Sequence, residues 1–194
     1  MSTVSHHLAL IHEAIAAAAG RAGRSPAEIE LVAVSKTHPP EAIIEALDAG
    51  QTLFGESRVQ EARAKIPLLP SRARWHFIGH LQKNKIRQAL ALGFELFHGI
   101  DSLELARDLN RIAEEAGARP SVLLEINVAG ESTKFGFSPA KLLEHLEEIV
   151  ALERLEIDGL MTIAPLAPKA EDSRRHFAAL RELRERLQGE FRLP

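Results

Sequence analysis

Short runs of apolar residues alternate along the chain with longer segments in which apolar positions recur every three or four residues. The short runs favour β-strands, and the helical periodicity of the longer segments predicts amphipathic helices. The expected strands cover residues 31–35, 52–54, 75–78, 96–98, 122–128 and 155–163. The expected helices cover residues 5–19, 40–49, 57–66, 82–92, 101–116, 138–151 and 171–187. The pattern therefore predicts strand–helix units in regular succession after an N-terminal helix.

Residues at the ends of these elements support the assignment. Ser25-Pro26-Ala27-Glu28 has the form of a capping box with proline at the first helical position. Asp101 and Glu104 are expected to cap the helix over 101–116, and Gly117 to end it. Ser138-Pro139 is expected to begin the next helix. The first strand, over 31–35, is continuous, apolar and β-branched, which predicts burial on both faces.

Strict alternation of strands and helices predicts an α/β fold in which helices cover a parallel sheet. An open doubly wound sheet and a (β/α) barrel of the TIM type both fit this order. No glycine-rich dinucleotide-binding sequence follows any strand, which favours the barrel. In such a barrel, functional residues lie where strands end and loops begin. The unusual residues of this chain fall at such places, at Ser35-Lys36-Thr37, Gly55-Glu56-Ser57, Gly79-His80 and Met161-Thr162.

Composition and charge narrow the classes of function. The 194 residues are enough for one domain, and a net charge of -3 is not typical of a general nucleic-acid binder. The absence of cysteine excludes disulfides, zinc–thiolate sites and cysteine nucleophiles. We find no N-terminal secretory signal and no apolar stretch of the roughly 20 residues that a membrane span needs. We therefore expect a cytoplasmic protein that binds neither nucleic acid nor membrane.

Lys36 is the first candidate for chemistry because it ends a strand that we expect to be buried. Partial burial at the mouth of a barrel disfavours an ammonium ion, and a neutral amine is what a carbonyl compound needs to form a Schiff base. The simpler alternative is a lysine whose charged end reaches water at a strand end. The residues alone favour this simpler alternative over a Schiff-base lysine.

A basic segment from Arg72 to Arg87 is a second candidate site. A helix N-terminus with nearby cations suits a phosphate or another anion, but a solvated helix face would have the same composition. His76 and His80 would lie ~13 Å apart on a continuous strand, too far to share one metal ion. We therefore expect no metal site.

Polar residues also gather at the end of the fifth strand, where the chain has Glu125, Asn127, Glu131 and Lys134. Buried polar groups need partners, and a ligand inside a barrel would supply them. A salt bridge between Glu131 and Lys134 on the following loop would explain part of the same cluster. The sequence leaves the two explanations about equal.

Five segments together identify a family. LVAVSKTHP around Lys36, FGESRVQE at 54–61, WHFIGHLQKNK at 75–85, EINVAGESTKFGF at 125–137 and GLMTIAP at 159–165 closely resemble the pyridoxal phosphate homeostasis protein family. The resemblance covers about residues 5–190 in the same order. It implies a single (β/α) barrel like the N-terminal domain of alanine racemase. It also implies pyridoxal 5'-phosphate (PLP) bound as a Schiff base on the lysine that matches Lys36, and no established catalytic activity.

The resemblance also suggests the members of the site. We assign cofactor binding to Lys36, Ser57, His76 and Met161, and we assign no catalytic residue and no metal ligand. The family usually has an asparagine near the cofactor ring where this chain has Ser57. A serine hydroxyl still forms hydrogen bonds there, but it has a shorter reach.

The family pattern continues beyond Leu193-Pro194, with a Ser/Gly-rich loop and an Arg-x-Gly segment on two more strands that hold the cofactor phosphate. The resemblance therefore implies that residues 1–194 form one PLP-binding barrel domain that lacks its last two strands. We expect these residues alone to bind the cofactor weakly. A longer chain is expected to be a monomer that binds it well.

The family role is to bind, buffer and deliver PLP, which would make PLP-dependent apoenzymes the clients of this protein. The alternative is a PLP-dependent amino-acid racemase. Racemisation needs a second acid or base on the far face of the cofactor, and the racemase relatives use a tyrosine from a second domain. This chain has no tyrosine. His76 is a poor substitute because of its position in a strand.

Overall fold

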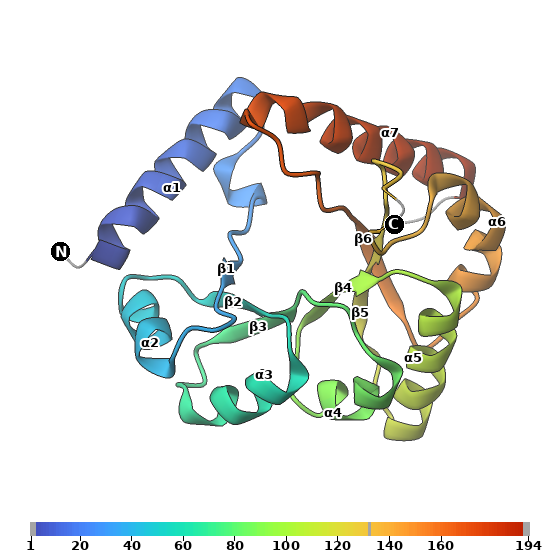
Figure 1. Cartoon of the computed structure of the whole chain (residues 1–194), viewed down its shortest axis with the longest axis horizontal. Coiled ribbons are helices and arrows are strands. Elements are labelled where there is room, and N and C mark those ends of the chain that lie inside the picture. The colour runs from blue at the N-terminus through green and yellow to red at the C-terminus, as the bar shows by residue number, and fades with distance from the viewer. Residues whose placement is uncertain (1–2, 132, 192–194) are drawn as a thin grey trace. The chain divides into compact units, whose positions relative to one another are not determined.

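The computed structural model describes residues 3–131 and 133–191, in two compact units, Met1–His76 and Phe77–Pro194. Strands and helices alternate along the chain (Figure 1). The strand order in the sheet is the order along the chain, from β1 to β6, and β1–β2, β4–β5 and β5–β6 are parallel pairs. The expected α/β class is therefore confirmed. Leu193 and Pro194, where we expect the domain to be incomplete, lie outside the described residues.

The first unit supplies the strands that surround Lys36. Its elements are α1 (Thr3–Arg21), the 3-10 helix η1 (Pro26–Glu28), β1 (Ala33–Val34), α2 (Pro40–Asp48), β2 (Leu53–Glu56), α3 (Val59–Lys65), the 3-10 helix η2 (Ile66–Leu68) and all of β3 (Arg74–Phe77) except its last residue. β1 pairs with β2 in parallel, with Val34 opposite Gly55. Arg74 N donates to Thr52 O at 2.8 Å, which places β3 beside β2.

The second unit continues the alternation. Its elements are η3 (Lys83–Lys85), α4 (Ile86–Leu90), β4 (Leu96–Ile100), α5 (Leu103–Ala116), β5 (Ser121–Glu125), α6 (Pro139–Val150), β6 (Glu156–Met161), η4 (Ala170–Ser173) and α7 (Arg174–Phe191). Within this unit α5 packs against α6, and α7 contacts β6 (Figure 1). No helix in the described part of the chain is long and apolar enough to cross a membrane.

The core of the second unit is formed by apolar side chains from its strands and helices. Phe97, Val122, Leu109 and Leu142 are each at most 1% exposed. Burying a side chain of this size stabilises the fold by roughly 1.5–3 kcal/mol. The helical periodicity of the sequence reflects this packing, because only one face of α5 and of α6 is buried.

Several helix ends confirm the sequence predictions. Ser25 and Glu28 form both hydrogen bonds of a capping box. Gly117 ends α5 with φ of 65°, a left-handed conformation that glycine adopts at little cost. The Ser138 hydroxyl accepts a hydrogen bond from Lys141 N at 3.3 Å at the start of α6.

The predicted cap of α5 is wrong. Its N-cap is Ser102, whose hydroxyl accepts a hydrogen bond from Leu105 N at 3.3 Å. Asp101 binds the ring of His80 instead, and Glu104 forms an ion pair with a lysine of η3. Serine and aspartate are both good N-cap residues. Because Asp101 is paired with His80, which is distant in sequence, Ser102 is the residue that caps the helix.

The predicted burial of the first strand is also wrong. β1 has two residues, Ala33 and Val34, and the side chain of Val34 is 51% exposed. β1 is the first strand in the sheet order and pairs with β2 alone, so its other edge carries no neighbouring strand in the described residues. β5 is also shorter than expected, because Asn127 N leaves the sheet and donates to Phe137 O.

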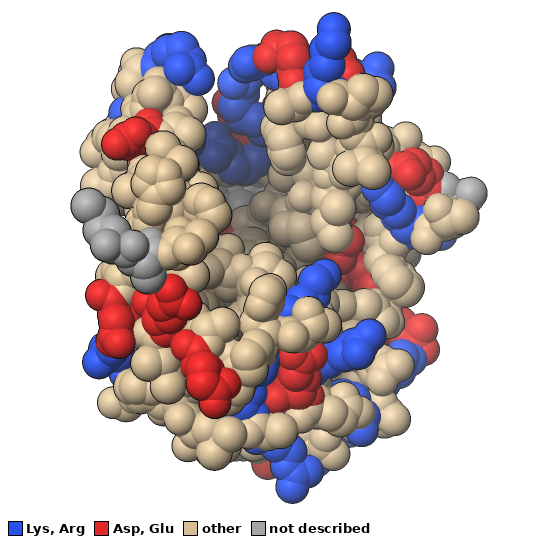
Figure 2. Space-filling view, turned by 60° about the vertical axis from the view of Figure 1, so that its left-hand side comes forward, with Lys and Arg blue, Asp and Glu red and all other residues tan. Residues whose placement is uncertain are grey.

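The basic segment Arg72–Arg87 contributes to exposed ion pairs. On the face drawn in Figure 2, Lys and Arg side chains lie among Asp and Glu side chains. The pairs are Arg72–Asp48 and Arg74–Glu30 in the first unit, and Lys83–Glu104 and Arg87–Glu115 in the second. These acidic partners favour the interpretation of the segment as a solvated surface over that of an anion site.

Candidate functional site

Lys36 lies in a tight turn that follows β1. Ser35 N donates to Gly55 O at 3.0 Å, and His38 N donates to Ser35 O at 3.1 Å and closes a four-residue turn. The Lys36 side chain is exposed, which corrects the expected partial burial. The reason is that β1 ends at Val34, before the lysine is reached. Within residues 3–131 and 133–191 the Lys36 amine has no ion-pair or hydrogen-bond partner, so it is open to an incoming ligand.

The residue after Lys36 has a strained backbone. Thr37 has φ of 65°, and it is the one non-glycine residue with positive φ among those described. A β-branched side chain in this region costs roughly 1–3 kcal/mol, and such strain persists only where the surroundings hold it. Glu61 provides that hold, because its carboxylate accepts a hydrogen bond from Thr37 N at 2.5 Å.

A buried ammonium ion joins the two sides of the turn. Lys65, the last residue of α3, is 6% exposed. Its Nζ donates to Glu56 Oε1 at 2.7 Å, to Glu61 Oε1 at 2.9 Å and to Ser35 O at 2.9 Å. The Ser35 hydroxyl also donates to Glu56 Oε1 at 2.8 Å, and the Glu56 side chain is fully buried. We call Glu56, Glu61 and Lys65 the ion network of the turn.

Hydrogen bonds and charges within this network favour the ionised forms of Glu61 and Lys65. The hydrogen bond from Lys65 holds the pKa of Glu61 below its usual range against the opposing effect of burial, and the bond from Thr37 N adds to the shift. Burial alone would lower the pKa of Lys65. Hydrogen bonds and charges from Glu56 and Glu61 outweigh burial, so the pKa of Lys65 is raised. Lys65 therefore stays an ammonium ion.

The sequence did not identify these residues as part of the site. Glu61 and Lys65 are four positions apart in a predicted helix, a spacing that indicates an ion pair on one helix face. That signal was available in the sequence. The contacts of this pair with Glu56, Ser35 and Thr37 depend on how α3 packs against the sheet, which no local spacing encodes.

Two of the predicted cofactor residues, Ser57 and His76, belong to the first unit, as Lys36 does. Ser57 is half-buried directly after β2, and the pairing of Val34 with Gly55 puts Lys36 and Ser57 at matching positions beyond neighbouring strands. His76 is 6% exposed within β3, beside β2. Because side chains alternate along strands, His76 shares a sheet face with Val34 and Gly55, opposite to the ion network.

Met161, the fourth predicted cofactor residue, belongs to the second unit. It is the last residue of β6 and is half-buried. Its carbonyl accepts a hydrogen bond from Ile126 N at 2.8 Å, and the Thr162 hydroxyl donates to Ile126 O at 2.7 Å. These bonds fix Met161 at the carboxyl end of a parallel strand, as the sequence predicted.

The second unit contains another cluster of titratable groups. His80 Nδ1 lies 2.7 Å from Asp101 Oδ2, and the imidazole stacks on Phe135 with centroids 4.1 Å apart. Glu125 is 8% exposed, and burial followed by the charge of Asp101 raises its pKa, against the effect of His80. A Cβ at Gly99 would lie 2.8 Å from a backbone oxygen and 3.4 Å from the Glu125 carboxylate, so only glycine fits there.

The raised pKa of Glu125 predicts a pH-dependent effect of Glu125→Gln. When folding raises the pKa of a carboxyl group, the protonated group stabilises the folded protein at pH values below the unfolded pKa of about 4.3. This stabilisation is lost as the pH rises through the folded pKa. The glutamine variant does not titrate, so its free energy of unfolding does not fall in this way. The free energy of unfolding of the variant minus that of wild type should therefore increase from pH 4 to pH 7.5. Urea unfolding at both pH values measures the difference. Exposed Glu147→Gln is the control, and an equal difference at both pH values for Glu125→Gln would contradict the assignment.

A cavity of about 190 Å³ adjoins Glu125 at the end of β5, with Asn127 and Lys134 in its lining. The Asn127 side-chain amide donates to Glu131 O at 2.8 Å, and Lys134 forms an ion pair with Glu131 at 2.9 Å. The local salt bridge therefore accounts for the loop residues of this cluster without a ligand. No group of three or more His, Asp or Glu side chains in the described part of the chain could hold a metal ion.

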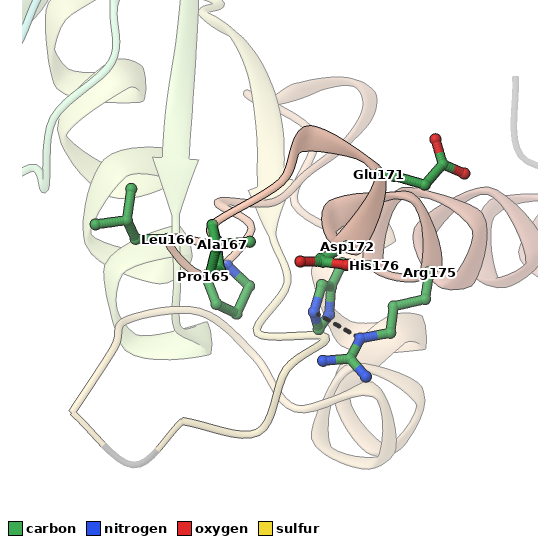
Figure 3. Close-up of a pocket in the computed structure, with 8 residues that line it drawn as sticks. Pro165, Leu166, Ala167, Glu171, Asp172, Arg175 and His176 are labelled. Atoms are coloured by element: carbon green, nitrogen blue, oxygen red, sulfur yellow. Dashed lines mark hydrogen bonds between the residues drawn. The ribbon is translucent and has the colours of Figure 1, made fainter.

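A larger pocket of about 380 Å³ lies between the loop after β6 and the start of α7 (Figure 3). Pro165, Leu166 and Ala167 line one side of it, and Arg175 and His176 line the other. The Arg175 guanidinium donates to the ring of His176 at 3.3 Å. None of the four predicted cofactor residues lines this pocket.

Comparison with known proteins first defines the class. The model of the family described as alanine racemase, N-terminal domain, matches residues 7–194. A solved alanine racemase from Clostridium difficile has the same fold, with a TM-score of 0.67 at 17% identity over 84% of this chain and 43% of its own. The chain thus has an α/β domain of the alanine racemase type, which confirms the expected (β/α) architecture.

More similar proteins narrow the class to one family. The pyridoxal phosphate homeostasis protein of Escherichia coli K12 is 45% identical over 175 residues, which cover 88% of this chain and 74% of that protein. The one from Aquifex aeolicus is 40% identical over 95% of this chain and 81% of its own length. PipY of Synechococcus elongatus, solved with PLP bound, is 38% identical with a TM-score of 0.80, over 97% and 83% of the two chains. The chain therefore belongs to the pyridoxal phosphate homeostasis protein family.

Proposed function

We propose that this protein binds PLP as a Schiff base on Lys36 and takes part in intracellular PLP homeostasis, without a dedicated catalytic reaction. The observation that carries the proposal is the exposed, unpartnered amine of Lys36 on a fixed turn among the described residues. The carboxyl ends of parallel strands are where such domains bind their ligands. Similarity to homeostasis proteins and to PLP-bound PipY supports the choice of cofactor.

The residues of the turn fit an aldehyde-bearing cofactor. Because Lys36 has no partner among the described residues, no ion pair must break before its nitrogen reacts. Loss of one proton leaves a lone pair on Nζ, which adds to the aldehyde carbon, and release of water completes the C=N bond. Bound PLP would supply an electron sink for amino-acid chemistry. Ser57, at the matching position beyond the neighbouring strand, has a hydroxyl group that can donate or accept a hydrogen bond.

The proposal extends to the domain and its partners. We assign residues 1–194 to one cofactor-binding domain because the family model spans 7–194. His76, in β3, and Met161, at the end of β6, are also assigned to cofactor binding, because each lies in one of the segments that resemble the family. PLP-dependent apoenzymes are the clients of a protein that stores and delivers the cofactor. We expect it to act as a cytoplasmic monomer.

A racemase-like enzyme is the alternative, and turnover distinguishes the two. Positioned acid and base groups accelerate a reaction by about 10²–10⁴-fold. The chain has no tyrosine that could act as the second acid or base of a racemase. We expect the PLP-loaded protein to racemise L-alanine no faster than free PLP at the same concentration. Chiral chromatography of the product measures this. Racemisation well above that background, abolished by Lys36→Ala, would favour the enzyme instead.

A further inference from the structure

The ion network holds both residues that flank Lys36. On the N-terminal side, Ser35 O accepts from Lys65 Nζ at 2.9 Å, and the Ser35 hydroxyl binds Glu56. On the C-terminal side, Thr37 N donates to Glu61. The two sides are connected, because Lys65 Nζ also binds both carboxylates.

The network leaves little freedom to the backbone of the turn. An ammonium ion has three N–H donors, and each donor of Lys65 has a separate acceptor. Ser35, Glu56 and Lys65 are buried, and charge-assisted hydrogen bonds are strong in such surroundings. Movement of Ser35 or of Thr37 would therefore break a charge-assisted hydrogen bond.

Lys36 itself depends on this backbone for its direction. Its side chain has no ion-pair or hydrogen-bond partner within residues 3–131 and 133–191, so nothing else in that part of the chain fixes the path of the amine. The next residue, Thr37, has the strained φ of 65°. Without an external hold, a threonine returns to negative φ, and the turn would direct Lys36 elsewhere.

We propose that Glu61 and Lys65 are positioning residues that hold the Thr37 turn and thereby present the Lys36 amine to the aldehyde of PLP. The inference rests on the proposed function, since it assumes that Lys36 forms the Schiff base. Neither residue reacts with the cofactor. They set the fraction of molecules in which the turn presents the Lys36 amine to the cofactor. When that fraction falls, the apparent rate of binding falls in the same proportion.

Glu61→Ala is the variant that isolates this role. It removes the acceptor of Thr37 N but leaves Lys65 paired with the buried Glu56 at 2.7 Å. The Glu61 side chain is 24% exposed, so its loss creates no closed cavity. A second change, Thr37→Gly, permits positive φ without an external hold, because glycine has no Cβ.

The measurement is the rate constant at which the visible Schiff-base band grows after PLP is added to each variant of the full chain. Glu61→Ala should slow the growth by about tenfold, which corresponds to about 1.4 kcal/mol. The double variant Glu61→Ala/Thr37→Gly should recover to within about threefold of Thr37→Gly alone. Exposed Glu45→Ala, which removes the same charge from α2, is the control and should match wild type.

Two results would overturn the inference while leaving the proposed function intact. One is a rate for Glu61→Ala equal to that of Glu45→Ala, with borohydride still fixing the cofactor on Lys36. The other is a slow Glu61→Ala that Thr37→Gly does not accelerate, since general destabilisation would not be relieved by a glycine in the turn. If wild type forms no band, the proposed function fails, and the positioning role fails with it.

Discussion

Replacing Lys65 with methionine will lower the free energy of unfolding by about 3–5 kcal/mol, the range typical of a buried ion pair that loses one partner. Met fills much of the space of the lysine stem but offers no N–H donors. Glu56, whose side chain is fully buried, would lose the ammonium partner that now lies 2.7 Å away. Urea unfolding of the cofactor-free protein measures the loss.

A double variant separates charge from packing. Glu56→Gln/Lys65→Met removes both buried charges, so it should be more stable than Lys65→Met alone, with a coupling energy of about 0.5–3 kcal/mol. Exposed Lys141→Met is the matched control and should change stability by less than about 0.5 kcal/mol. A loss for Lys65→Met as small as that of the control would show that the network contributes little.

The pKa shifts set the pH range in which this loss is largest. Glu61 has a lowered pKa, so its contribution is present above the unfolded value of about 4.3 and disappears as pH falls through the folded value. Lys65 has a raised pKa, so its contribution is present below about 10.4 and disappears as pH rises through the folded value. The difference between wild type and Lys65→Met should therefore be greatest between these limits.

Lys36→Arg is expected to abolish the visible Schiff-base band and to weaken PLP retention by at least about tenfold, or about 1.4 kcal/mol. Arginine keeps the positive charge and similar length, but a guanidinium group stays protonated and cannot form the imine. The cofactor-free stability should change by less than about 0.5 kcal/mol, because the side chain is exposed. Absorbance and equilibrium dialysis at several PLP concentrations measure the two effects.

The same substitution at an exposed lysine elsewhere, Lys141→Arg, should leave both band and retention unchanged. If Lys36→Arg retained as much borohydride-fixed cofactor as wild type, another amine would carry the Schiff base. The proposal for Lys36 would then be wrong, whatever the affinity.

Most of the fold was predictable because its signals are local. The amphipathic periodicity of 101–116 and 138–151, the capping box at Ser25, and Gly117 each act within one or two helical turns, and each prediction is confirmed. β1 was not predictable in this way. Its apolar sequence indicates burial, but the exposure of Val34 follows from the place of the strand at the start of the sheet order.

The site was predictable only in part for the same reason. Parallel alternation brings the residues after β1 and β2 to one edge, so Lys36 and Ser57 could be placed together from sequence. The ion network could not, because Lys65 reaches Ser35 across 30 positions of the chain. The positive φ of Thr37 also has no sequence signal, since threonine is disfavoured there.

The proposed attachment to Lys36 is tested most directly by mapping it. The protein is incubated with PLP, reduced with borohydride, digested, and analysed by mass spectrometry for the lysine that carries the added pyridoxyl group. The account predicts that the group lies on Lys36, and that omission of borohydride leaves no stable label. A label found mainly on Lys83 or Lys134 would contradict it.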